Sequence, residues 1–173
     1  MAEKLIRELI DGNKEYVSNM GNEIVKHVSG QKPKIAILTC ADSRVIPEFI
    51  FNKSIGELFV VRVAGNIALG DTVIKSLEYA VDHLSVKILM ILGHTNCGAI
   101  KAAEDSEKLG CGELIEEIKS SFSMGENHTL CNLSRQLRML PKRSEIIYKH
   151  IKEEKVKLIG ALYNLETGFV EFL

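Results

Sequence analysis

The sequence predicts an α/β fold: a central, mostly parallel β-sheet with an antiparallel C-terminal edge strand, flanked by helices and preceded by an N-terminal helical arm. Two observations carry this prediction. Short apolar runs typical of buried strands alternate with longer segments whose apolar residues recur at helical spacing. Only a short turn containing Gly168 separates the last two strands, which makes the final strand antiparallel to the one before it.

The length and composition indicate one globular domain. The chain of 173 residues can bury a sizeable core, so we expect a single domain over 1–173, with an arm at 1–30 and an α/β core at 31–173. A net charge of −1 argues against nucleic-acid or anionic-lipid partners. No apolar run reaches the ~20 residues of a membrane helix, and the charged N-terminus lacks a signal-peptide core. We therefore expect a cytoplasmic protein, in which the four cysteines serve metal binding or catalysis.

The N-terminal arm carries apolar side chains at helical spacing from residue 3 to about 20, among them Leu5, Leu9 and Val17. We expect one helix, or two helices separated at Gly12 and Asn13. Whether this arm packs on its own domain or on a partner subunit stays open.

The elements of the core follow from apolar spacing, glycines and prolines. The expected strands lie at 34–39, 56–63, 86–92, 156–163 and 169–172. The expected helices lie at 47–51, from 71 to about 84, from 98 to about 107, between Gly112 and Gly125, at 132–140, and from 144 to about 154. Asp71 and Ser144 are predicted N-caps. Pro141 is predicted to stop the helix that precedes it.

Three metal-ligating residues stand beyond strand ends, where sites lie in open α/β sheets. Cys40 directly follows strand 34–39, and His94 comes two residues after strand 86–92. If these strands are neighbours, their tips lie ~5 Å apart. Cys97 begins the next helix, whose free N–H groups favour a thiolate. Since two thiolates and one imidazole suit zinc, we predict that Cys40, His94 and Cys97 hold one Zn²⁺ ion. Gly93 and Gly98 are expected to permit tight backbone geometry beside it.

Asp42 and Arg44, beside Cys40, can form a bidentate ion pair; the alternative is an ordinary solvated surface pair. Structural zinc normally has four protein ligands, whereas catalytic zinc has three and keeps a position for water. Asp42 is close enough to Cys40 to act as a fourth ligand. The other cysteines and histidines are interpreted as core, loop or helix-end residues, or are candidates by residue type only: Cys111, Cys131, His83 and His128.

Three segments together resemble the β-class carbonic anhydrases: CADSR at 40–44, RVAGN at 62–66 and GHTNCGA at 93–99. The ending at 160–168 and the N-terminal arm are similar to the family as well, and the compact length resembles its archaeal-type branch. The resemblance implies Cys40, His94 and Cys97 as ligands of one Zn²⁺ per subunit, with no further cofactor. It implies Asp42 and Arg44 as a catalytic dyad.

The resemblance also implies the reversible hydration of carbon dioxide to bicarbonate and a proton, by a homodimer or higher homo-oligomer whose arm packs on the partner. In some members the aspartate closes the site by binding zinc, and in others it pairs with the arginine and leaves zinc open to water. The absence of tryptophan favours the open form. Three alternatives remain: a hydrolase of COS or CS2, a non-catalytic zinc-binding regulatory protein, and a redox pair formed by Cys40 and Cys97.

Overall fold

The computed structural model describes residues 1–105 and 112–173. These residues form two compact units, Met1–Gln31 and Lys32–Leu173, and each is described here by itself. Cys111 and the end of the helix predicted near residue 107 lie outside the described residues. Across the described ranges, no helix combines the length and the apolar character needed to cross a membrane.

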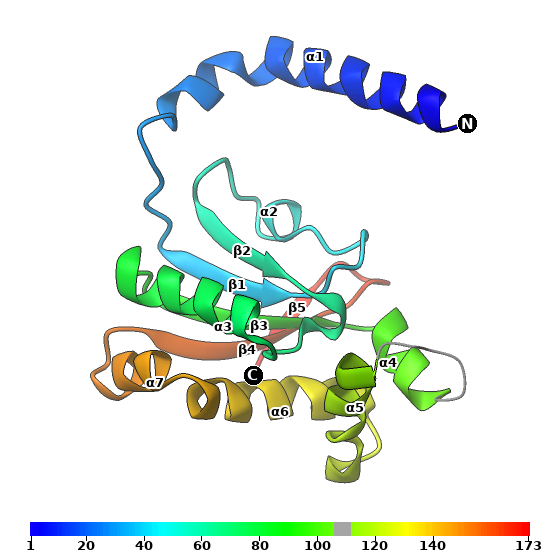
Figure 1. Ribbon diagram of the computed structural model, residues 1–173, viewed down its shortest axis with the longest axis vertical. Coiled ribbons are helices and arrows are strands. Elements are labelled where there is room, and N and C mark those ends of the chain that lie inside the picture. The colour runs from blue at the N-terminus through cyan, green and yellow to red at the C-terminus, as the bar shows by residue number, and fades with distance from the viewer. Residues whose placement is uncertain (106–111) are drawn as a thin grey trace. The chain divides into compact units, whose positions relative to one another are not determined.

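The first unit is one helix, α1 (Ala2–Lys26), which continues through Gly12 and Asn13 (Figure 1). A glycine inside a helix costs only about 0.5–1 kcal/mol relative to alanine, so a single one does not end a helix of this length. Most apolar side chains of α1 are exposed, among them those of Leu5, Ile6, Leu9, Ile10, Tyr16, Val17 and Val25.

The second unit is built on one five-stranded sheet with the order β2-β1-β3-β4-β5. Its strands are β1 (Ile35–Thr39), β2 (Leu58–Arg62), β3 (Ile88–His94), β4 (Lys157–Tyr163) and β5 (Val170–Phe172). The first four are parallel, and β5 is antiparallel to β4, as predicted. Because β1 and β3 are neighbours in register, Thr39 lies opposite Leu92 and the two strands end side by side.

Different elements pack on the two faces of the sheet. Along β1, Ala36 and Leu38 pack into the main core, whereas Ile37 belongs to a separate cluster on the opposite face. The main core is completed by residues of α3 (Asp71–Glu78), α6 (His128–Arg143) and α7 (Glu145–Lys152) (Figure 1). The opposite face is covered within this chain mainly by α2 (Pro47–Ile50) and the segment around β5.

Beyond the end of the sheet lie α4 (Gly98–Glu104) and α5 (Gly112–Lys119). Three short helical segments complete the fold: the 3-10 helices Ala64–Asn66 and Phe122–Met124, and the π-helix Tyr79–His83 that continues α3. Ser144 caps α7 as predicted, because its side chain accepts a hydrogen bond from Ile147 N.

Several predicted helix boundaries are wrong: α6 begins at His128 rather than at 132, and two residues predicted to mark boundaries have other positions. Gly70, with a φ of +82°, is the N-cap of α3, and Asp71 is its first residue. Asp71 still lies where the helix dipole favours an acidic side chain. Pro141 lies inside α6, which continues to Arg143. Proline has no N–H, so one helical hydrogen bond is missing. The missing bond lies in the last turn of α6, only two residues before the helix ends, and the rest of the helix is unaffected.

Candidate metal centre

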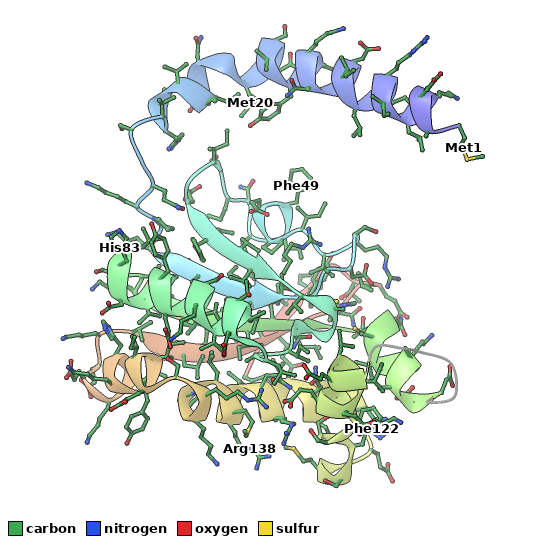
Figure 2. The ribbon with its side chains drawn as sticks, in the orientation of Figure 1. Met1, Met20, Phe49, His83, Phe122 and Arg138 are labelled. Carbon is green, nitrogen blue, oxygen red and sulfur yellow. The ribbon has the colours of Figure 1, made fainter. Side chains whose placement is uncertain are left out.

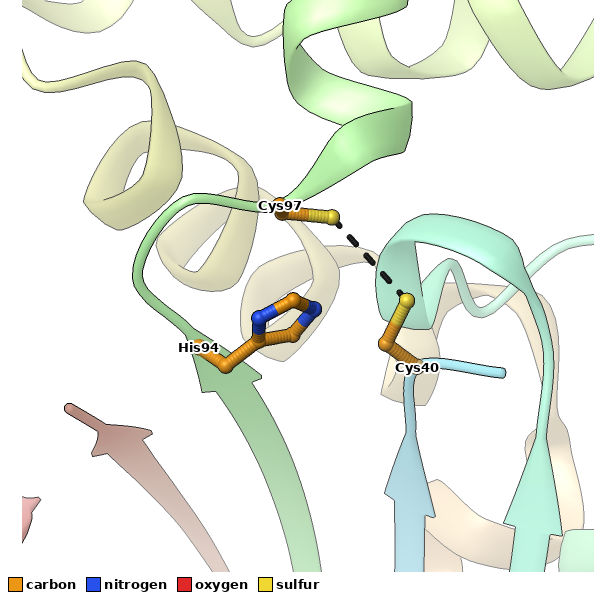
Figure 3. Close-up of side chains that lie close together, drawn as sticks. All are labelled: Cys40, His94 and Cys97. Atoms are coloured by element: carbon orange, nitrogen blue, oxygen red, sulfur yellow. Dashed lines mark hydrogen bonds between the residues drawn. The ribbon is translucent and has the colours of Figure 1, made fainter. Parts of the chain in front are cut away.

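The three predicted ligands meet at the carboxyl ends of β1 and β3. One ligand atom from each of Cys40, His94 and Cys97 lies within 4.8 Å of the others, and all three residues are buried (Figure 3). The two sulfur atoms are 3.9 Å apart. Cys40 directly follows β1, and Cys97 is the N-cap of α4. His94 is the last residue of β3 rather than two residues beyond it, so the strand itself fixes its backbone.

His94 is oriented by its neighbours so that one ring nitrogen is left for a ligand. Its Nδ1 lies 2.9 Å from the carbonyl oxygen of Thr95, an acceptor, so Nδ1 carries the proton. Thr95 is held in turn by Tyr163 O, at 2.9 Å from its N–H, and by Leu165 N, which donates to its hydroxyl. His94 Nε2 is buried and has no hydrogen-bond partner among the described residues. A buried unpaired nitrogen beside two sulfurs is the arrangement that a metal ion satisfies.

The two thiols share an environment that separates their pKa values. The hydrogen bond with Cys97 lowers the pKa of Cys40, against the effect of burial. The Cys40 sulfur and burial together raise the pKa of Cys97. Two thiolates this close repel each other, so the pair loses one proton readily and holds the second. A divalent cation between them removes the repulsion, and two thiolates with one imidazole are donors that zinc prefers. The cluster is therefore able to bind a metal ion.

Asp42 and Arg44 form the ion pair that the sequence predicts. Arg44 Nε donates to Asp42 Oδ1 at 2.9 Å, and Arg44 NH2 donates to Oδ2 at 2.7 Å. The backbone N–H of Arg44 adds a third bond to Oδ1 at 3.0 Å. These bonds lower the pKa of Asp42, so its carboxylate is ionised. Oδ2 lies 4.0 Å from His94 Nε2, which puts the carboxylate beside the ligand cluster.

Two further groups at the site were not predicted from the sequence. Arg62 donates from Nε to Cys40 O at 3.2 Å and from NH2 to Asp42 O at 2.6 Å, which ties β2 to the loop after β1. The Gly65 N–H donates to Cys40 Sγ at 3.3 Å. The adjacent glycine and asparagine at 65 and 66 are a turn signal, but nothing local shows which way the turn faces.

The glycine that the site requires is Gly65, rather than Gly93 or Gly98 as predicted. It has a φ of +71°, and a Cβ there would lie 2.8 Å from Ile118 Cδ1. A Cβ at Gly93 would make only ordinary contacts, at 3.7 Å or more, and one at Gly98 would meet none of the described atoms within 4 Å. The expectation that Gly93 and Gly98 permit tight geometry at the ion is therefore wrong.

The remaining cysteine and histidine candidates have other partners. Cys131 is buried, and its thiol donates to Gly125 O at 3.5 Å. His83 ends the π-helix after α3 (Figure 2). Its ring stacks on that of Tyr79. His128 is hydrogen-bonded to Glu104 Oε1 at 2.7 Å and stacks on Phe122.

Comparison with known proteins gives the family. A family model described as carbonic anhydrase matches residues 35–170, which is most of the chain and includes all three predicted ligands. The chain belongs to the carbonic anhydrase family. Carbonic anhydrase 2 of Mycobacterium tuberculosis is 31% identical over 94% of this chain and 88% of that protein. A carbonic anhydrase of Mycolicibacterium smegmatis is 30% identical over 95% of this chain and 90% of its own length.

Solved carbonic anhydrase structures have the same fold. The β-carbonic anhydrase of Coccomyxa in complex with acetazolamide is 26% identical, with a TM-score of 0.81 over 96% of this chain and 85% of that one. The β-carbonic anhydrase CafA of Aspergillus fumigatus has a TM-score of 0.87 over 97% of this chain and 90% of its own, and at 23% identity it shows the fold alone. Together with the family match, these structures support the β-class within the carbonic anhydrase family.

Proposed function

We propose that the protein is a zinc enzyme that catalyses the reversible hydration of carbon dioxide to bicarbonate and a proton. The observation that carries the proposal is the buried Cys40, His94 and Cys97 cluster, with its unpaired histidine nitrogen, in a chain of the carbonic anhydrase family. Zinc at such a site supplies the Lewis acidity that brings the pKa of a bound water to about 7. The other roles in the proposed reaction belong to side chains of this chain.

In this proposal Cys40, His94 and Cys97 hold one Zn²⁺ per subunit, and Asp42 accepts a hydrogen bond from the attacking water and orients it. Arg44 engages both oxygens of Asp42, which keeps the carboxylate from the metal. This pairing supports the open form of the site. Three protein ligands and a restrained aspartate also argue against a purely structural zinc, which four protein ligands normally close.

The side chains around the cluster suit an uncharged, apolar substrate. Cys40 and Cys97 belong to an apolar cluster with Ile67 and Ile100, against which Val63 packs. Carbon dioxide has no net dipole, and it can be held by such a surface while water remains at the polar side with Asp42. COS and CS2 share this character, so they belong in the same assay.

We also infer a homodimer or higher homo-oligomer, in which the arm at 1–30 contacts a partner and completes a single domain with the core at 31–173. The exposed apolar side chains of α1 support this assembly. Tetrameric β-carbonic anhydrases of Sordaria macrospora share the fold, with a TM-score of 0.85. The compact archaeal-type branch and the cytoplasmic location stay predictions from the sequence.

Stopped-flow measurement of CO2 hydration, with zinc analysis of the same sample, tests the proposal. We expect about one zinc per chain, a rate well above background, and loss of both on removal of zinc by a chelator. Bound zinc without measurable CO2 hydration would support a non-catalytic regulatory protein. Faster turnover of COS or CS2 than of CO2 would show that one of these is the substrate. A change in free thiols on oxidation with no bound zinc would support the redox pair.

A further inference from the structure

A chain of buried hydrogen bonds leads from α5 and α6 to the metal centre. Gln136 Nε2 donates to Glu117 Oε1 at 3.2 Å and to Asn132 Oδ1 at 3.0 Å. Asn132 Nδ2 donates to Gly65 O at 2.8 Å, and Gly65 N–H donates to Cys40 Sγ at 3.3 Å. Asn132 is 1% exposed and Gln136 is 0% exposed, so these bonds are shielded from water.

The two amides are committed to fixed orientations. Both protons of Gln136 Nε2 have acceptors, and its Oε1 accepts from Ala68 N at 2.9 Å. The network therefore holds both ends of the segment 65–68. Leucine at either position would pack well in an apolar core, whereas a buried amide fixes one arrangement, because any other leaves polar atoms unpaired.

Glu117, at the end of the network away from the metal centre, is held by ion pairs with two arginines. Arg143 NH2 donates to Glu117 Oε2 at 2.7 Å, and Arg135 Nε donates to Oε1 at 3.1 Å. Burial alone would raise the pKa of Glu117, but the hydrogen bonds from these arginines outweigh it and lower the pKa. An ionised, doubly paired carboxylate is a fixed acceptor for Gln136, which keeps the amide from rotating.

We propose that Asn132 and Gln136 are positioning residues of the metal centre, which hold Gly65 so that its N–H donates to the Cys40 thiolate. This rests on the proposed metal site. An N–H donor withdraws electron density from a thiolate, so it sets how much charge Cys40 gives to the metal. Neither amide contacts the ligands directly, and both act through the backbone at Gly65.

The test uses the full-length protein loaded with Co²⁺, whose sulfur-to-cobalt charge-transfer band reports the charge on the thiolates. Asn132→Leu removes the donor to Gly65 O and keeps the same number of side-chain heavy atoms with the same branching. We expect the band to move to longer wavelength and the metal affinity to fall by about tenfold or more. Gln136→Leu should shift the band in the same direction by less, and the double variant no further than Asn132→Leu.

Ser144→Ala is the matched control. Ser144 is also buried on this side of the sheet, but it bonds to Glu78 and Ile147 N, so its loss should reduce stability and leave the band unmoved. An unshifted band and unchanged affinity in folded Asn132→Leu would overturn the proposal, and Gln136→Leu decides if Asn132→Leu does not fold. A wild-type protein that gives no band with Co²⁺ would instead refute the metal site itself.

Discussion

Arg44 supplies the three hydrogen bonds that the Asp42 carboxylate accepts among the described residues, two from its guanidinium and one from its backbone. The same guanidinium donates to Asn96 O at 3.2 Å, so it also links the loops that carry Cys40 and Cys97. The distance from Asp42 Oδ2 to His94 Nε2 is 4.0 Å, which is short enough for a small rotation to bring the carboxylate to a metal. In the proposed mechanism, the ion pair therefore decides whether water has a place at the site.

Replacing Arg44 with alanine tests this role. We expect Arg44→Ala to free Asp42 to bind the metal, so the hydration rate should fall by roughly 10²-fold while zinc per chain falls far less. The rate and the zinc content are measured on the same samples. Lys53→Ala, which breaks the exposed pair with Glu57, is the control and should change neither. Equal losses of zinc and rate would assign Arg44 a structural role.

The three proposed ligands could be predicted from the sequence because each lies at or just after the end of a strand that the local apolar pattern defines. Cys40 directly follows an apolar run, and His94 and Cys97 lie between another apolar run and the helix that begins at Gly98. Asn132 and Gln136 could not be predicted, since their partners Gly65 and Ala68 are 67 and 68 residues away in the chain. Long-range contacts between side chain and backbone leave no periodic signal.

At the scale of elements, strands and most helices follow from periodicity, and the errors lie at helix boundaries. The helix α6 continues past Pro141, where the prediction ended it, and of the two forms expected for the arm the structure has the single helix through Gly12. Both residues have unfavourable local propensity, and in each case the surrounding helix outweighs it, as tertiary and neighbouring interactions commonly do. A single glycine or proline therefore marks a boundary less reliably than a cap such as Ser144.

The segment Ala64–Asn66 gives an element-scale prediction. Gly65→Ala should destabilise the protein by about 1–3 kcal/mol, because its φ is +71° and the new Cβ would meet Ile118 at 2.8 Å. Gly98, which directly follows Cys97, has open space around it and starts a helix, so we expect no loss of stability in Gly98→Ala. Urea unfolding of the two variants measures the difference. Equal destabilisation would show that Gly65 is not under special constraint.

At the scale of the molecule, α1 is the part least explained by a single chain. Most of its apolar side chains are exposed, and Leu9 is 74% exposed. A helix of this kind gains most of its stability by burying its apolar face against another element. A second copy of the chain, as proposed above, supplies that surface.

A charged residue on the apolar side of α1 should therefore weaken the assembly. We expect the wild-type protein to sediment as a dimer or larger species, and Leu9→Glu to shift it towards the monomer at micromolar concentration. Lys14→Gln changes the net charge by the same amount on the same helix and should leave the assembly intact. A wild-type monomer, or an unaltered assembly in Leu9→Glu, would exclude α1 from the contact.

The central claim, that the cluster binds the zinc on which CO2 hydration depends, is tested most directly by His94→Ala. Zinc per chain and the stopped-flow hydration rate are measured for this variant, for the wild type, and for His83→Ala, which alters a histidine outside the cluster. We predict about one zinc and full activity for the wild type and His83→Ala, and loss of both for His94→Ala. Full zinc content and an unchanged rate in His94→Ala would contradict the claim.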